Sequence, residues 1–93
     1  MFVEDQPGEV AAFPLGLAPR GFGGSIEAIS VSDDTSSLPP AEIERRLIEL
    51  GFVEGATVHI LHEGLFGRDP IAVRVNGTTV ALRRREAMAI LVK

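Results

Sequence analysis

The chain has 93 residues, 45% of them hydrophobic, and a net charge of −4, which suits one globular domain with a small core. The absence of cysteine excludes disulfides, thiolate zinc sites and cysteine nucleophiles, and no apolar run approaches the roughly 20 residues of a membrane span. The acidic net charge argues against a nucleic-acid-binding protein. The amino terminus lacks the basic start and apolar middle of a secretory signal, so we expect a cytoplasmic protein.

Residues 1–23 are predicted to form a flexible or irregular lead-in, and residues 24–93 a single barrel domain. The lead-in contains four glycines and three prolines and has little apolar periodicity. Its first dozen residues are expected to be a tail, whereas Phe13, Leu15 and Leu17 can pack onto the domain. From Ile26 the apolar and polar residues alternate, which predicts a first strand, and a polar loop follows at residues 32–40.

A short helix is predicted at about residues 40–50. Ile43, Leu47 and Leu50 recur at the spacing of one helix face, and a proline at position 40 suits the first turn. The sequence also predicts where the helix ends. Gly51 can take the left-handed conformation after the last turn, which places Phe52 against Leu47, as in a Schellman motif.

The rest of the chain has strand patterns, with a hairpin as the clearest of them. Asn76-Gly77 is the preferred two-residue turn of a tight hairpin. It predicts the pairs Val75 with Thr78, Val73 with Val80, Ile71 with Leu82, Ala72 with Ala81, and Arg74 with Thr79. A last short strand is expected around Ile90 and Val92. Five short strands and one helix predict a mainly β fold, a small barrel whose closure removes exposed edges.

The stretch GLFGRDPIAVRV, residues 64–75, resembles a phosphate-binding loop only in composition. A Walker loop leads into a lysine and a helix, whereas this stretch leads into a strand and the only lysine of the chain is Lys93. We expect a long hairpin loop in which Gly64 and Gly67 permit positive φ. Leu65 and Phe66 lie at its tip, where they either fold back onto the barrel or contact a partner.

No catalytic or metal-binding set of residues is apparent. His59 and His62 lie three positions apart on a strand, so they are expected on opposite faces, and no cysteine accompanies them. No Ser/His/Asp set and no glutamate pair is signalled. We therefore expect no catalytic residue, no metal site, no cofactor and no enzymatic activity. The run Arg83-Arg84-Arg85 has two interpretations, a solvated strand edge or a docking patch.

Several short motifs of the sequence, taken in order, resemble those of the FeoA family of bacterial ferrous iron uptake. They are Leu50-Gly51-Phe52, then Val53-Glu54-Gly55, then residues 65–71, then Asn76-Gly77, and finally residues 83–90. The resemblance covers roughly residues 24–93. The sequence departs from the family pattern at Leu65, where a proline is common, at Arg68, which has the position of a one-residue insertion, and at Val53-Glu54, which replace a proline-containing turn.

The resemblance implies an SH3-like five-stranded barrel with one inserted helix, and a non-enzymatic accessory of FeoB, the membrane transporter with a GTP-binding domain. The implied partner is the cytosolic side of that transporter, with no nucleic acid and no direct membrane insertion, and weak self-association is an alternative use of the same exposed residues. The candidate partner-binding residues are Leu65, Phe66, Arg68, Arg83 and Arg84.

A second interpretation is a regulatory barrel like the C-terminal domain of metal-dependent transcriptional repressors. Those proteins carry a DNA-binding domain before the barrel, and about 23 residues are too few for one. The free-standing accessory is therefore the expected function.

Overall fold

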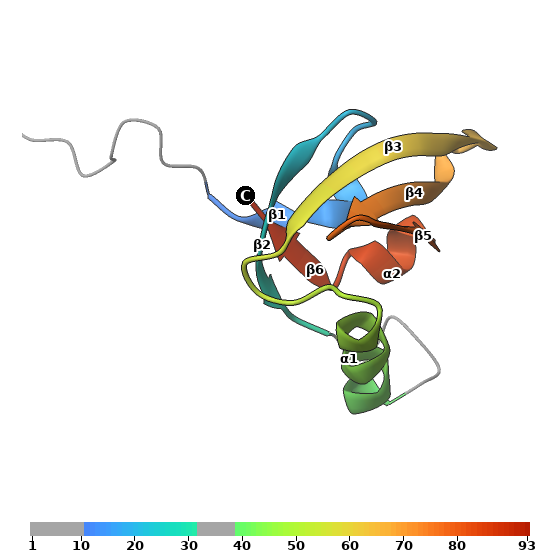
Figure 1. Ribbon diagram of the computed structural model, residues 1–93. Coiled ribbons are helices and arrows are strands. Elements are labelled where there is room, and N and C mark those ends of the chain that lie inside the picture. Colours follow the sequence, from blue (N-terminus) through green and yellow to red (C-terminus); the bar gives the residue numbers. More distant parts are fainter. Residues whose placement is uncertain (1–10, 32–38) are drawn as a thin grey trace, which may run out of the picture.

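The computed structural model describes residues 11–31 and 39–93; most of the predicted tail, residues 1–10, and most of the polar loop, residues 32–38, lie outside this part. Six antiparallel strands form one curved sheet in the order β1-β6-β2-β3-β4-β5 (Figure 1). The strands are β1 (Phe13–Pro14), β2 (Gly23–Ile29), β3 (Thr57–Phe66), β4 (Asp69–Val75), β5 (Thr78–Leu82) and β6 (Ile90–Val92). The helical elements are the 3-10 turn η1 (Leu15–Leu17), α1 (Pro40–Glu49) and α2 (Arg84–Ala87).

The mainly β class with one short inserted helix is confirmed, but the count of five strands and the closed barrel are wrong. The extra strand, β1, has two residues and pairs with β6, as Phe13 with Val92 and Pro14 with Leu91. Two residues are too few to show alternation, which is why the sequence pattern missed it. Within the described sheet β1 and β5 are the two end strands, and no ladder joins them.

Strand β2 connects the two halves of the sheet. Its first part, Gly23 to Ser25, pairs with β3, and its second part, Ile26 to Ile29, pairs with β6. The register shifts between Ile26 and Ala28, where an extra residue bends the strand. The bend turns one face of the sheet inward, so that a single apolar core forms.

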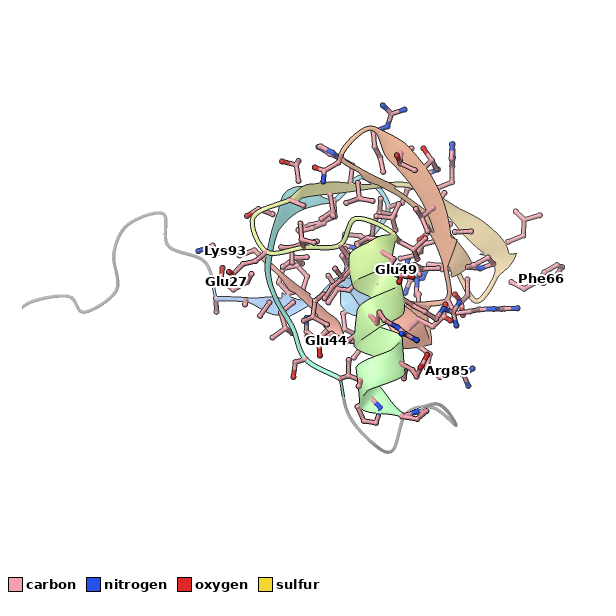
Figure 2. The ribbon with its side chains drawn as sticks, turned by 60° about the horizontal axis from the view of Figure 1, so that its bottom comes forward. Glu27, Glu44, Glu49, Phe66, Arg85 and Lys93 are labelled. Atoms are coloured by element: carbon pink, nitrogen blue, oxygen red, sulfur yellow. The ribbon has the colours of Figure 1, made fainter. Side chains whose placement is uncertain are left out.

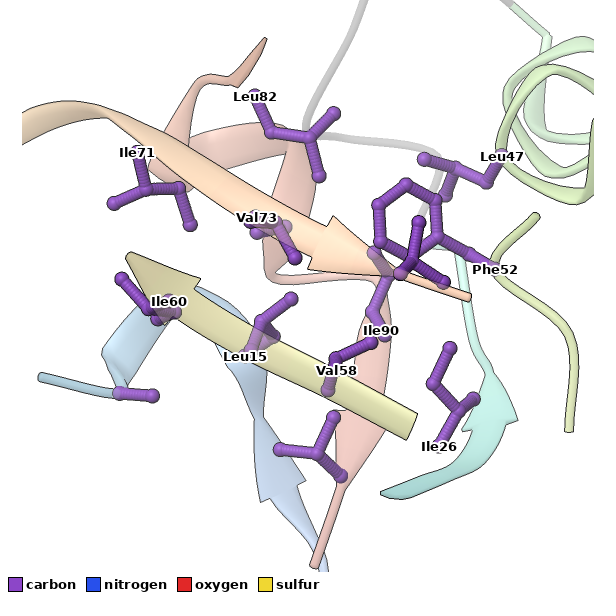
Figure 3. Close-up of a cluster of buried hydrophobic side chains, with 14 of the residues drawn as sticks. Leu15, Ile26, Leu47, Phe52, Val58, Ile60, Ile71, Val73, Leu82 and Ile90 are labelled. Carbon is purple, nitrogen blue, oxygen red and sulfur yellow. The ribbon is translucent and has the colours of Figure 1, made fainter. Parts of the chain in front are cut away.

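The core lies inside this curve, and α1 covers one side of it (Figures 1 and 3). Phe52 is the largest fully buried side chain. From the predicted lead-in, Leu15 and Ala18 are buried in the same core, whereas Leu17 is 66% exposed. The division of the chain at residue 24 stays a prediction. The other large core residues are Ile26, Leu47, Val58, Ile60, Ile71, Val73, Val75, Leu82, Ile90 and Val92.

The predicted helix and its end are confirmed. Pro40 occupies the first helical position, and Gly51 has φ 107°. The Phe52 N–H donates to the Leu47 carbonyl at 3.0 Å, and the Gly51 N–H donates to the Ile48 carbonyl at 2.9 Å. These two bonds define a Schellman motif, which turns Phe52 into the core next to Leu47 (Figure 3).

The hairpin of β4 and β5 has the predicted register in all five pairs. Asn76 and Gly77 both have positive φ, 50° and 84°, as a two-residue type I′ turn requires. Val73, Val75 and Leu82 are buried, so this register turns their face of the hairpin into the core.

Replacing Gly77 with alanine should lower the free energy of unfolding by about 1 to 2 kcal/mol, the cost of placing a side chain in the left-handed region. A Cβ at this position would meet nothing within 4 Å, so the effect is conformational and not steric. The melting temperature should fall by roughly 5 to 15 °C. Thr78→Ala is a matched surface control, and an equal effect of both changes would contradict the role of the turn.

Candidate docking surface

Strands β3 and β4 form a hairpin that projects from the domain (Figure 1). Their ladder continues to the pair Phe66 with Asp69, which leaves only Gly67 and Arg68 as the turn. These two residues have φ 68° and 58°. The expectation of a long loop is therefore wrong: the segment is strand almost to its end, joined by a tight two-residue turn. The rejection of a phosphate-binding loop agrees with this geometry, because no helix follows the turn.

Gly64 is required for a different reason from the one expected. Gly67 has a positive φ, as expected, whereas Gly64 does not. A Cβ on Gly64 would instead collide with the carbonyl group of Asp69 and would lie 3.1 Å from the Pro70 nitrogen. The register of β3 and β4 shifts between Glu63 and Phe66, at this close approach. Gly64 therefore allows the backbones of the two strands to approach closely near the end of the hairpin.

Leu65 and Phe66 point away from the domain. Leu65 is 93% exposed and Phe66 is 88% exposed, the highest values among the exposed large apolar residues of the described chain. Figure 2 shows Phe66 at the outer extremity of the hairpin. Of the two interpretations of this pair, folding back onto the barrel is excluded by these exposures, and the side chains remain available for contact.

Arg84 ties the base of this hairpin to two other segments. Its guanidinium donates to the carbonyl oxygens of Gly16 at 3.0 Å and Ala18 at 2.7 Å, in and after η1. It also donates to the Arg68 carbonyl at 2.7 Å and to the Glu63 carboxylate at 2.9 Å. The side chain is only 18% exposed. Arg84 thus differs from its neighbours in the arginine run, because its donors are used within the chain.

The carboxylates around the hairpin are used in a similar way. The Glu63 carboxylate pairs with Arg84, the Asp69 carboxylate accepts from the Arg84 backbone N–H at 2.8 Å, and the Glu86 carboxylate accepts from the Arg83 N–H at 3.0 Å. All three acids are half-buried. The exposed arginines nearby are Arg68, Arg83 and Arg85.

These three arginines make no ion pair with any carboxylate in the described part of the chain. The acids are therefore bonded within the chain, whereas the exposed bases have no carboxylate partner among the described residues. We call the group Leu65, Phe66, Arg68, Arg83 and Arg85 the tip surface.

The expected placement of the two histidines is wrong. His59 pairs with Arg74 and His62 pairs with Ala72, which are two residues apart on β4 and so lie on one face. An extra residue in β3, Leu61, shifts the register and turns His62 to the same outer face as His59. Both side chains are exposed. No group of three or more potential metal ligands occurs among residues 11–31 and 39–93.

A family model described as the FeoA domain matches residues 13–93. The chain belongs to the FeoA family. Members of this family are accessory domains of ferrous iron transport, and the family is not a known enzyme family. A search of curated protein sequences finds no match. In the described residues of this FeoA chain, no helix is long and apolar enough to cross a membrane.

Solved structures agree with this assignment. FeoA of Stenotrophomonas maltophilia complexed with zinc, described as an SH3 domain protein, is 33% identical with a TM-score of 0.71, and the match covers 88% of this chain and 91% of that one. An FeoA-like protein from Clostridium acetobutylicum is 26% identical with a TM-score of 0.73, over 91% of this chain and 88% of that one. The SH3-like fold expected for this FeoA chain is thereby confirmed.

A manganese-dependent transcriptional repressor is also similar, with 25% identity and a TM-score of 0.69. The match covers 87% of the FeoA chain but only 40% of the repressor. The FeoA fold therefore corresponds to one part of that longer protein.

Proposed function

We propose that this FeoA chain is a cytoplasmic accessory of ferrous iron uptake that contacts the cytosolic part of a FeoB-type GTP-binding transporter. The proposal rests on the exposure of Leu65 and Phe66 at the end of a hairpin whose strands stay paired up to its two-residue turn. Leaving two large apolar side chains in water forgoes about 1.5 to 3 kcal/mol of burial for each. A partner that covers them recovers this free energy, which is typical of a docking site and not of a catalytic one.

The five candidate residues have two roles in this proposal. Leu65, Phe66, Arg68 and Arg83 make contact with the transporter, since all four side chains are exposed. Arg84 does not contact the transporter in this proposal. It stabilises the hairpin, because its guanidinium donates to the carbonyl of Arg68 in the turn and to the carboxylate of Glu63. Weak self-association through Leu65 and Phe66 is the competing use of the same surface.

Capture of the chain by the detergent-solubilised cognate transporter tests this function. We expect the wild type to be captured and Phe66→Asp to be lost, because a carboxylate cannot be buried in an apolar contact without a large cost. The control is Ile48→Asp on α1, which replaces another exposed apolar residue away from the hairpin (Figure 1). Circular dichroism and thermal melting establish that both variants are folded.

Equal capture of the folded Phe66→Asp variant would place the contact elsewhere on the domain. No capture of the wild type, under any nucleotide or iron condition, would overturn the accessory function. The similarity to the manganese-dependent repressor favours a second candidate, a regulatory barrel. That candidate predicts a change in the DNA affinity of a metal-dependent repressor when this chain is added, as measured by gel shift.

A further inference from the structure

We infer that the tip surface is built for an apolar pocket of a protein partner that is bordered by carboxylates. This inference rests on the proposed function and specifies the chemistry of its partner. Its first observation is that acids and bases at the hairpin differ in exposure. The acids Glu63, Asp69 and Glu86 are half-buried and accept hydrogen bonds from within the chain. The bases Arg68, Arg83 and Arg85 are exposed and have no ion-pair partner among the described residues.

The three exposed arginines belong to the hairpin turn and to the segment that is bonded to it through Arg84. Arg68 is in the turn that follows Phe66 directly. Arg83 and Arg85 flank Arg84, whose backbone N–H is bonded to Asp69 and whose side chain is bonded to the Arg68 carbonyl. Figure 2 shows Arg85 and Phe66 on the same side of the molecule, opposite Glu27 and Lys93. The apolar pair and the exposed arginines therefore lie on one side of the molecule.

Arginine at all three positions favours discrete oxyanions as the contacts, and in a protein partner these are carboxylates. The guanidinium group is planar and binds a carboxylate with two parallel hydrogen bonds, whereas lysine acts as a point charge. The only lysine, Lys93, lies elsewhere and pairs with Glu27. A border of arginines thus gives directional contacts around the buried apolar pair, and it also accelerates association with an acidic partner.

The charge of the rest of the molecule favours a local pocket over an extended anionic surface. The chain has a net charge of −4, and α1 carries three exposed glutamates, Glu42, Glu44 and Glu49, against two exposed arginines, Arg45 and Arg46. A membrane or a nucleic acid presents negative charge over a wide area, which is unfavourable for a chain with a net negative charge. A protein pocket that receives only the hairpin end avoids this repulsion.

The test measures association of the full-length chain with the solubilised transporter at about 50 and 500 mM salt. We expect the association rate of the wild type to fall at least about tenfold at the higher salt. The double change Arg83→Glu and Arg85→Glu should lower the rate at low salt by a similar factor and remove most of the salt dependence. The matched control, Arg45→Glu with Arg46→Glu on α1, changes the net charge by the same amount and should keep the wild-type rate.

The other outcomes overturn the acidic border, the proposed function or the class of partner, and each can be distinguished from the others. Capture of the wild type that neither salt nor the Arg83/Arg85 reversal changes would overturn the acidic border and leave the proposed function intact. Absence of capture at both salts would overturn the proposed function, and this inference with it. Binding of the wild type to phosphatidylglycerol vesicles or to duplex DNA, lost in the double variant, would replace the protein partner by a membrane or a nucleic acid. Vesicles of phosphatidylcholine alone are the neutral control.

Discussion

Replacing Phe52 with alanine should lower the free energy of unfolding by about 3 to 5 kcal/mol, a large fraction of the roughly 5 to 15 kcal/mol of a typical domain. The Phe52 side chain is fully buried in the core, directly after the Schellman motif that ends α1. Alanine leaves a cavity between α1 and the sheet, which the surrounding residues can fill only in part. Urea unfolding followed by circular dichroism measures the shift of the midpoint.

The matched control for this change is Phe66→Ala, which removes the same atoms from a side chain that is 88% exposed. That variant should stay within about 0.5 kcal/mol of the wild type. A loss of stability in Phe66→Ala as large as that in Phe52→Ala would contradict the outward position of the hairpin end.

The second large effect is expected for Arg84→Met, which keeps much of the length of the side chain and removes all of its donors. The carbonyl oxygens of Gly16 and Ala18 and the carboxylate of Glu63 would lose their guanidinium partner in partly buried positions. Because unsatisfied buried acceptors each cost about 1 to 3 kcal/mol, and water can reach some of these, we expect a total loss of about 2 to 4 kcal/mol.

Two further variants test the geometry of this network by the same unfolding measurement. Arg85→Met removes an exposed arginine from the same short helix and should change stability by no more than about 0.5 kcal/mol. Arg84→Lys should recover only part of the loss, since one ammonium cannot reach acceptors in three segments. Equal stability of Arg84→Met and Arg85→Met would show that the network contributes nothing to folding.

Local patterns in the sequence were sufficient to predict the elements whose conformation is determined by neighbouring residues. The Asn76-Gly77 turn fixes the register of β4 with β5, because a shift by one residue would turn Val73 and Val75 to water. Gly51 fixes the end of α1 in the same way, since few other residues accept its φ of 107°. In both cases one backbone conformation determines the path of the chain over several residues.

Features that depend on distant contacts were missed or misplaced. The extra residue Leu61 in β3 has no local signature, and it moved His62 to the face opposite the predicted one. The role of Arg84 depends on carbonyl groups of residues 16 and 18, more than sixty positions earlier, which no spacing rule connects to the arginine run. For the candidate site, the sequence identified Leu65 and Phe66 but did not show that their strands continue to a two-residue turn.

The two-residue turn between β3 and β4 affects the entropy of binding. Ordering the backbone of a flexible loop would cost about 1 to 2 kcal/mol for each residue fixed. Here the ladder already fixes the backbone up to the pair Phe66 with Asp69. A partner therefore has to immobilise mainly the side chains of the hairpin end, at about 0.5 to 1.5 kcal/mol for each. A small contact of two apolar side chains and a few arginines can then give measurable affinity, because most of the ordering took place when the domain folded.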